Sequence, residues 1–339
     1  MKTIFIVDDN DTNLMTAKSA LEGAYKTFAL PSAERMFKLA ERITPDLILL
    51  DVAMPEMNGF EALSILKSDD NLKTIPVIFL TAKNDAESEI RGFEQGAIDF
   101  INKPFSPPVL IRRIETHIEI DRLIKESLQS VRKVHNATIN VMANLVESRD
   151  NTTGGHIDRT QQYLSILVDE LLRAGVYSDE IAHWNLDALL PSAQLHDVGK
   201  ITVSDLILNK PGKLTDEEFD LMKLHCDEGE RIIDEMIVKA EEDGFLIHAK
   251  KFASHHHEKW DGTGYPRKLD GEGIPLEGRV MAIADVYDAL VSERPYKKPF
   301  THEQAIEIIK TGAGTQFDPS LVDVFLSVED SFSQVEKTL

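Results

Sequence analysis

Apolar and polar residues alternate in two different ways along the 339-residue chain, and the first way covers residues 1–105. Short, fully apolar runs there are typical of buried parallel strands. They lie at 3–7, 46–50 and 76–80, with a shorter one at 99–101. Segments of helical periodicity separate them, for example 12–22, 32–42 and 57–68. The alternation predicts a flavodoxin-like α/β domain, built on a doubly wound parallel sheet.

A long stretch without proline or glycine follows this first domain. Ser106-Pro107-Pro108, directly before it, is a helix-start signal, because proline is tolerated in a first helical turn. Apolar residues then recur at helical intervals up to about Arg149, and charges fill the other faces. The pattern predicts a helical connector over 106–149, either one helix or two in near succession. Its apolar seam suits a homodimer, or packing against the chain's own second domain. Three polar residues interrupt the seam: His117, Asp121 and His135.

The second way of alternating covers residues 150–339, where long segments have helical periodicity and no strand pattern is evident. An all-α domain is therefore predicted. The helical segments are 155–174, 180–196, 215–240, 245–259, 277–292 and 301–311. Histidines and aspartates that suit iron, manganese or zinc lie on several of these segments. They are His156, His196, Asp197, His225, His256, His257 and Asp285. Convergence of ligands from several helices is how helical bundles build centres of two metals.

Charge and composition exclude some classes of protein. A formal net charge of −21 argues against DNA or general nucleic-acid binding, which requires a basic face, and no basic helix-turn-helix is visible. An anionic ligand must therefore meet local positive groups or metal ions. The single cysteine, Cys226, excludes an internal disulfide and fits a reducing cytoplasm. No segment approaches the roughly 20 apolar residues of a membrane helix, so we expect a cytoplasmic protein without a membrane partner.

Polar residues follow the predicted strands of the first domain. Asp8 and Asp9 follow the first run, and Asp51, Thr81 and Lys103 follow later ones. Carboxylates that meet at one edge of a sheet repel each other unless a hard cation such as Mg²⁺ joins them. A carboxylate beside Mg²⁺ can attack a phosphoryl group. Each aspartate taken alone is better explained as the cap of the following helix.

Taken together, these residues resemble the receiver domain of two-component response regulators, and the resemblance covers residues 1–105. It implies that Asp51 is the phospho-acceptor, and that Asp8 and Asp9 help to hold Mg²⁺. Thr81 and Lys103 would contact the phosphoryl oxygens. Phe100 stands at the family's aromatic switch position. The resemblance also implies a cognate sensor histidine kinase as a partner.

Two blocks of the second domain carry a second resemblance. Residues 195–200 read Leu-His-Asp-Val-Gly-Lys, and residues 255–266 read His-His-His-Glu-Lys-Trp-Asp-Gly-Thr-Gly-Tyr-Pro. Over about 145–325 the chain resembles the HD-GYP family of cyclic-dinucleotide phosphodiesterases. The resemblance implies two divalent metals, with iron or manganese favoured over zinc. One ligand set is shared with the wider HD superfamily: His156, His196, Asp197 and Asp285. The second metal adds His225, His256 and His257, with Asp197 bridging the pair.

Further roles follow from the same resemblance. Lys200 would stabilise charge on the phosphate or assist the leaving group, and Asp150 would either orient this lysine or cap a helix. Tyr265 would stack on a guanine base, or belong to a purely structural turn. Arg294 and Lys297 would contact phosphates. Family members with a third metal have a glutamate where this chain has a threonine, Thr152. The remaining histidines, His255 included, are expected to be structural, and Phe317-Asp318-Pro319 is expected to close the last helix.

The sequence therefore predicts a response regulator that hydrolyses cyclic di-GMP. A hydroxide activated by two metals would attack phosphorus, giving linear pGpG and, if a second cut follows, GMP. Cyclic GMP-AMP is an alternative substrate. A non-catalytic module that binds a dinucleotide or a diguanylate cyclase partner is an alternative of another class. The sequence leaves open the identity of the metal, the oligomeric state and whether phosphorylation activates or inhibits.

Overall fold

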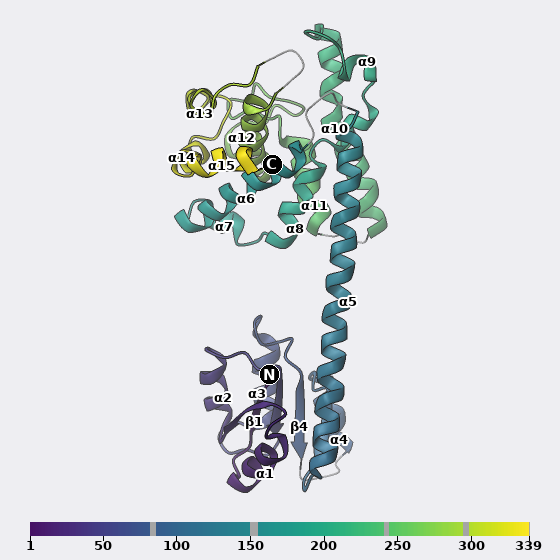
Figure 1. The fold of residues 1–339 in the computed structure, drawn as a ribbon, viewed down its shortest axis with the longest axis vertical. Helices are drawn as coiled ribbons and strands as arrows, with labels where there is room; N and C mark the ends of the chain where they lie inside the picture. Colours follow the sequence, from purple (N-terminus) through teal and green to yellow (C-terminus); the bar gives the residue numbers. More distant parts are fainter. Residues whose placement is uncertain (82–85, 150–154, 241–243, 294–297, 339) are drawn as a thin grey trace. The chain divides into compact units, whose positions relative to one another are not determined.

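The computed structural model describes residues 1–81, 86–149, 155–240, 244–293 and 298–338. The chain divides into two compact units, residues 1–131 and 132–339 (Figure 1). Each unit has hydrophobic clusters of its own.

The first unit is built on a sheet of five parallel strands, in the order β2-β1-β3-β4-β5. The strands are β1 (Thr3–Val7), β2 (Lys26–Leu30), β3 (Leu47–Asp51), β4 (Val77–Thr81) and β5 (Asp99–Asn102). The helices between them are α1 (Asp11–Leu21), α2 (Ala33–Ala40), α3 (Gly59–Ser68) and α4 (Ala86–Glu94). The predicted doubly wound α/β fold is confirmed. No range was predicted for strand β2 or helix α4; β2 is a half-buried edge strand that lacks a fully apolar run.

The carboxyl ends of the central strands lie in register. Asp51 on β3 is opposite Leu80 on β4, and Thr81 is opposite Asn102 on β5. Behind Asp51, helix α3 begins at Gly59, where an added Cβ would lie 2.3 Å from the Asp51 carbonyl oxygen. Only glycine allows this approach of helix to strand. The close contact holds the loop after β3 against the edge where the aspartates lie.

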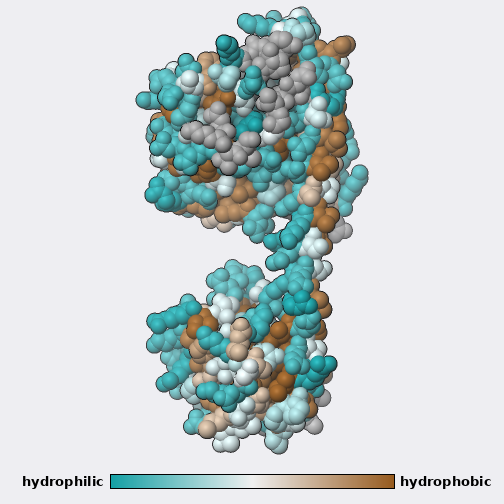
Figure 2. Space-filling model, in the orientation of Figure 1, coloured by the Kyte–Doolittle hydropathy of each residue, from teal (hydrophilic) through white to brown (hydrophobic). Residues whose placement is uncertain are grey.

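Helix α5 (Pro107–Glu147) is one continuous helix, as the first of the two predicted arrangements requires. Apolar side chains lie exposed along it among hydrophilic ones (Figure 2), including Leu123, Leu128, Val131 and Val134. They belong to the seam noted in the sequence, and the homodimer through this seam stays a prediction. Among the described residues, no helix combines the length and hydrophobicity that crossing a membrane requires.

The second unit contains helices and no strand among its described residues, which confirms the predicted all-α domain. Its longer helices are α6 (His156–Ala174), α10 (Asp216–Ala240), α11 (Gly244–His255), α12 (Leu276–Val291), α13 (His302–Thr311), α14 (Pro319–Ser327) and α15 (Glu329–Thr338). Shorter ones are α7 (Ser178–Ile181), α8 (Leu186–Ser192) and α9 (Asp205–Leu208). The 3-10 helices are η1 (Ala193–Leu195), η2 (Val198–Thr202) and η3 (Gly271–Gly273). Helix α6 packs on α12, and the buried rings of Tyr163 and Tyr287 meet between them.

Three predictions about these helices were wrong. The segment 180–196 is not one helix but α7, α8 and η1, since helical spacing of apolar residues continues across the breaks. Helix α11 ends at His255 rather than at residue 259. Phe317-Asp318-Pro319 does not close the last helix; it begins α14, which α15 follows. The Asp318 side chain accepts a hydrogen bond from the Ser320 N–H, while its other oxygen bonds Arg279 in the core.

Candidate metal centre

The predicted ligands of the second unit converge on one cavity of about 320 Å³. Its walls come from α5, α6, α10 and α12, together with the 3-10 segment after η1 and the turn after α11. Six of the seven predicted ligands line it: His156, His196, Asp197, His225, His257 and Asp285. The seventh, His256, lies in contact with His257, with the two ring centres 4.0 Å apart.

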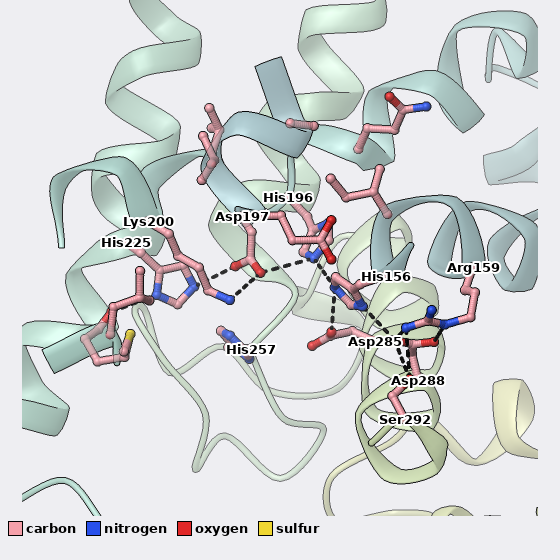
Figure 3. A pocket seen from close by; sticks show the side chains of 18 of the residues that line it. His156, Arg159, His196, Asp197, Lys200, His225, His257, Asp285, Asp288 and Ser292 are labelled. Atoms are coloured by element: carbon pink, nitrogen blue, oxygen red, sulfur yellow. Dashed lines mark hydrogen bonds and ion pairs between the residues drawn. The ribbon is translucent and has the colours of Figure 1, made fainter. Parts of the chain in front are cut away.

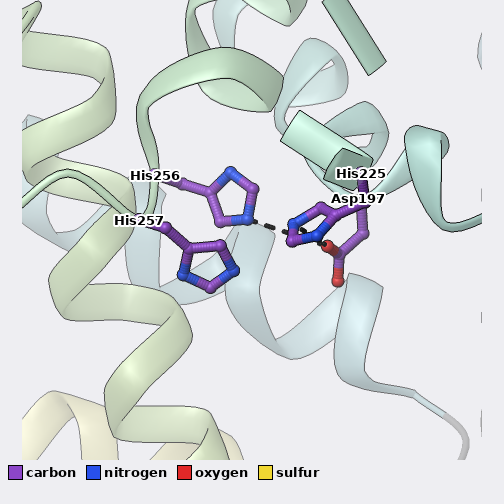
Figure 4. A group of neighbouring side chains, drawn as sticks. All are labelled: Asp197, His225, His256 and His257. Carbon is purple, nitrogen blue, oxygen red and sulfur yellow. Dashed lines mark ion pairs between the residues drawn. The ribbon is translucent and has the colours of Figure 1, made fainter. Parts of the chain in front are cut away.

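One group of four potential ligands consists of Asp197 and three histidines near its Oδ1 atom (Figure 4). The Nε2 atoms of His225 and His256 lie 3.5 and 3.7 Å from Asp197 Oδ1, and His257 completes the group. Asp197 Oδ1 and His256 Nε2 are both buried without a hydrogen-bond partner. Buried polar atoms are rarely left unpaired. This pair of orphaned atoms therefore fits a cation between them.

A second group of three lies beside the first (Figure 3). His156 Nε2 is 3.4 Å from His196 Nε2 and 3.6 Å from Asp285 Oδ1. The second oxygen of Asp197, Oδ2, is 3.4 Å from His196 Nε2. Asp197 therefore presents one oxygen to each group, which is the geometry that a carboxylate bridging two metals requires.

Local hydrogen bonds turn the imidazole rings toward the cavity. The Nδ1 atoms of His225 and His256 lie 2.7 Å from Met222 O and 2.8 Å from Phe252 O. His196 Nδ1 lies 2.8 Å from Ala193 O in the same way. A carbonyl can only accept, so each Nδ1 carries a proton, and Nε2 is the nitrogen left to face the cavity as a ligand. The backbone of the preceding helical turn thus prepares the histidines for ligation.

Burial keeps two of these histidines in the protonation state that metals need. It lowers the pKa of His225 to about 4 and that of His257 well below its usual value, so both rings are neutral near pH 7. Burial alone would raise the pKa of Asp197. The positive charge of Lys200 and the neighbouring His196 outweigh it and hold that pKa well below the ordinary value. Asp197 is therefore a carboxylate.

Asp288 is a site residue that the sequence reasoning missed. Its Oδ2 lies 2.8 Å from His156 Nδ1, and Arg159 donates two hydrogen bonds to its carboxylate, at 2.6 and 3.0 Å. Asp288 is 2% exposed, and His156 and Arg159 keep its pKa low against the effect of burial. Asp288 therefore orients the ring of His156, as backbone carbonyls orient the rings of His196, His225 and His256. Its position three residues after Asp285, on the same face of α12, was the available signal.

Replacing Asp288 by asparagine is expected to weaken metal binding by about tenfold, because the orientation and basicity of His156 depend on this carboxylate. The free energy of unfolding is expected to fall by about 3 kcal/mol, because Arg159 would keep a buried charge without its partner. Titration of the folded variant with Mn²⁺ and urea denaturation measure the two effects. Asp323→Asn, on an exposed position of α14, is the control. An unchanged Mn²⁺ affinity of this variant would show that Asp288 does not support the metal ligands.

The other predicted residues of this unit divide into those near the cavity and those outside the described residues. Lys200 Nζ lies 2.7 Å from Asp197 Oδ2 and lines the cavity. The Tyr265 ring also lines it, 4.8 Å from the ring centre of His257. Asp150, Arg294 and Lys297 lie outside the described residues, as does Thr152.

Three of the remaining histidines, His248, His302 and His255, have side-chain partners that suit a structural role. His248 Nδ1 lies 2.9 Å from Glu277, and His302 Nδ1 lies 2.7 Å from the Tyr287 hydroxyl. His255 belongs to neither ligand group. Its Nδ1 lies 2.7 Å from the Ser254 hydroxyl, whereas the next two histidines in the sequence belong to the group around Asp197.

In the first unit, the carboxylates of Asp8, Asp9 and Asp51 lie together as predicted. Lys103 Nζ is 2.7 Å from both Asp8 Oδ2 and Asp51 Oδ1. Burial, together with the charge of Asp8, raises the pKa of Asp51 despite this lysine. Thr81 is buried at the end of β4, the strand beside Asp51. Three acidic groups at one sheet edge offer a site for Mg²⁺.

Phe100 is also buried, which bears on its predicted switch role. It is 7% exposed, and its ring centre lies 5.3 Å from that of Phe79 and 5.0 Å from that of Phe93 on α4. An added Cβ on Gly92 of α4 would lie 2.4 Å from the Phe100 ring. The ring is therefore packed between β5 and α4, and the switch role stays a prediction.

Comparison with known proteins adds two family matches and several relatives. Residues 140–321 match the HD domain family, and residues 4–115 match the response regulator receiver domain. A "Probable cyclic di-GMP phosphodiesterase" of Vibrio cholerae serotype O1 is 40% identical, over 98% of this chain and 79% of its own. "Cyclic di-GMP phosphodiesterase response regulator RpfG" of Xanthomonas campestris is 32% identical, over 86% of this chain and 77% of its own. A "3'3'-cGAMP-specific phosphodiesterase 2" of Vibrio cholerae is 39% identical, over 58% of this chain and 35% of its own.

Proposed function

The chain belongs to the HD domain family and carries a response regulator receiver domain, and we propose that it is a metal-dependent cyclic di-GMP phosphodiesterase of HD-GYP type. The observation that carries the proposal is the position of Asp197, which presents one oxygen to each of two ligand groups. These groups would hold two divalent metals, with iron or manganese expected. Relatives named cyclic di-GMP phosphodiesterases support the substrate.

The residues around the cavity suit hydrolysis of a phosphodiester. When bound, two divalent cations supply Lewis-acid charge and lower the pKa of a water molecule toward neutrality. Lys200 adds an ammonium group beside Asp197, where it can pair with a phosphate oxygen or stabilise the leaving ribose oxygen. The Tyr265 ring offers a flat face on which a guanine base would gain about 1–3 kcal/mol by stacking. Linear pGpG is the expected product, and GMP follows if a second cut occurs.

Anaerobically purified protein loaded with Mn²⁺ or Fe²⁺ is expected to convert cyclic di-GMP to pGpG, as measured by chromatography of the nucleotides. Removal of the metal by a chelator is expected to stop the reaction, and re-addition to restore it. Protein that carries two metals per chain and forms no product from cyclic di-GMP would contradict the proposed function.

Cyclic GMP-AMP is the second candidate substrate, and the relative specific for 3'3'-cGAMP supports it. The ligand groups are equally suited to both dinucleotides, because the scissile bond is the same phosphodiester. Parallel assays of the two substrates separate the candidates. We expect kcat/KM to favour cyclic di-GMP by at least about tenfold, equivalent to about 1.4 kcal/mol. Equal values would contradict this preference.

We propose that a sensor histidine kinase phosphorylates Asp51 and that the receiver thereby controls hydrolysis. Purified protein with Mg²⁺ is expected to incorporate phosphate from acetyl phosphate, and an Asp51→Asn variant is expected to incorporate none. Asp70→Asn, at an exposed residue of the same unit that pairs with Lys73, is the control. The phosphorylated and unphosphorylated forms are expected to differ in hydrolysis rate. Equal rates would contradict control by the receiver.

A further inference from the structure

The short segment that carries Asp197 and Lys200 ends in carbonyl groups that need donors from outside it. Helix η2 (Val198–Thr202) follows Asp197 directly, and the chain then becomes extended at Val203. The last carbonyls of a helix have no donor within it. The carbonyl oxygens of Ile201 and Val203 are in this position. A group that binds them fixes the segment at the end opposite to Asp197.

Arg149 supplies these missing donors. Its Nη1 lies 2.6 Å from Ile201 O, and its Nη2 lies 3.0 Å from Val203 O. Nη2 also donates to Asp205 Oδ1 at 2.8 Å. In return, the Asn209 side chain donates to the Arg149 carbonyl at 2.8 Å. A guanidinium group presents its N–H donors in a fixed planar fork, which suits several acceptors at once.

Arg149 follows directly on the last turn of α5, and that turn forms part of the cavity wall. Ala143, Val146 and Glu147 of α5 line the cavity beside the ligand groups. The end of α5 therefore contacts the metal centre in two ways. Its last turn lines the cavity, and Arg149 hydrogen-bonds the segment that follows Asp197.

We propose that Arg149 is a positioning residue of the metal centre, which fastens the end of α5 to the segment that carries Asp197 and Lys200. The inference rests on the proposed function, because it concerns the ligand shared by both groups. Loosening these hydrogen bonds would leave the histidine ligands on α6 and α10 in place. It would allow Asp197 to move relative to them, so that both metals bind less tightly.

An Arg149→Lys variant tests the proposal, since lysine keeps the charge and loses the planar fork. We expect its Mn²⁺ affinity to fall about tenfold, as for other residues that support metal ligands. Amide hydrogen exchange over residues 198–203 is expected to be faster. Arg132→Lys is the matched control, because Arg132 also lies on α5 and pairs with Asp187 at the surface. The control is expected to bind Mn²⁺ and exchange hydrogen like the wild type.

The possible results separate this inference from the proposed function. A wild-type protein that binds no Mn²⁺ contradicts the proposed function. A wild type that binds Mn²⁺, with a folded Arg149→Lys variant of equal affinity, overturns the inference even if the variant melts at a lower temperature. If Arg149→Lys does not fold, Asp205→Ala removes one of the hydrogen-bond partners and keeps the two carbonyl contacts. Its Mn²⁺ affinity is then expected to fall about threefold, and an unchanged affinity overturns the inference.

Discussion

An Asp197→Ala variant is expected to bind no metal at stoichiometric concentration and to lose all measurable hydrolysis. Asp197 is the residue common to both ligand groups, with Oδ1 facing His225 and His256 and Oδ2 facing His196. It also provides a negative charge, because its pKa is held well below the usual value. Alanine removes both carboxylate oxygens and that charge at once. The loss should exceed the roughly 10- to 100-fold reduction that follows from losing a supporting residue.

The metal content of Asp197→Ala, measured by mass spectrometry after dialysis, and its product formation on cyclic di-GMP check this expectation together. His255→Gln is the matched control, because His255 belongs to the same run of three histidines and to neither ligand group. It is expected to keep both metals. Hydrolysis retained by a metal-free Asp197→Ala protein would rule out a mechanism in which Asp197 bridges two metals.

The sequence predicted the members of the metal centre better than their arrangement. All seven predicted ligands lie in the two groups. The HD and Gly-Tyr-Pro blocks contain four of them, and the family resemblance supplied the other three: His156, His225 and Asp285. The supporting contacts are harder to predict. Asp288 bonds His156 across 132 residues, and Arg149 bonds Ile201 across 52. Neither pairing leaves a periodic pattern, since it depends on how helices far apart in sequence pack together.

Some elements of the fold could likewise be predicted from the sequence and others could not. Fully apolar runs predicted β1, β3 and β4, whereas β2 was missed because its residues are only partly buried. Long helices such as α10 were predicted within one or two residues of their ends. The segment 180–196 was predicted wrongly as one helix. Its apolar spacing reports burial in the core, but burial alone does not show where a helix stops and a 3-10 turn begins.

Helix η2 is held from two sides, and this determines the position of Asp197. Arg149 binds its carboxyl-terminal carbonyls from the end of α5. On the other side, η2 lies directly against α10, which carries His225. Gly199 of η2 and Gly229 of α10 meet at this contact. The distance between Asp197 and His225 therefore depends on two glycines that allow two backbones to touch.

Replacing Gly199 by alanine is expected to disrupt this contact. An added Cβ would lie 1.9 Å from the His225 carbonyl oxygen and 2.5 Å from the Gly229 nitrogen. Both are backbone atoms, so η2 must move away from α10 and take Asp197 with it. Overpacking of this kind costs about 1–3 kcal/mol of unfolding free energy.

The larger consequence of Gly199→Ala is at the metal centre, where Mn²⁺ affinity and hydrolysis are expected to fall by more than about tenfold, because ligand groups act only when held in place. Isothermal titration with Mn²⁺ and the cyclic di-GMP assay measure this loss in the folded variant. Gly273→Ala is the matched control, since an added Cβ there meets no atom within 4 Å. If Gly199→Ala bound metal and hydrolysed substrate like this control, the contact between η2 and α10 would not set the position of Asp197.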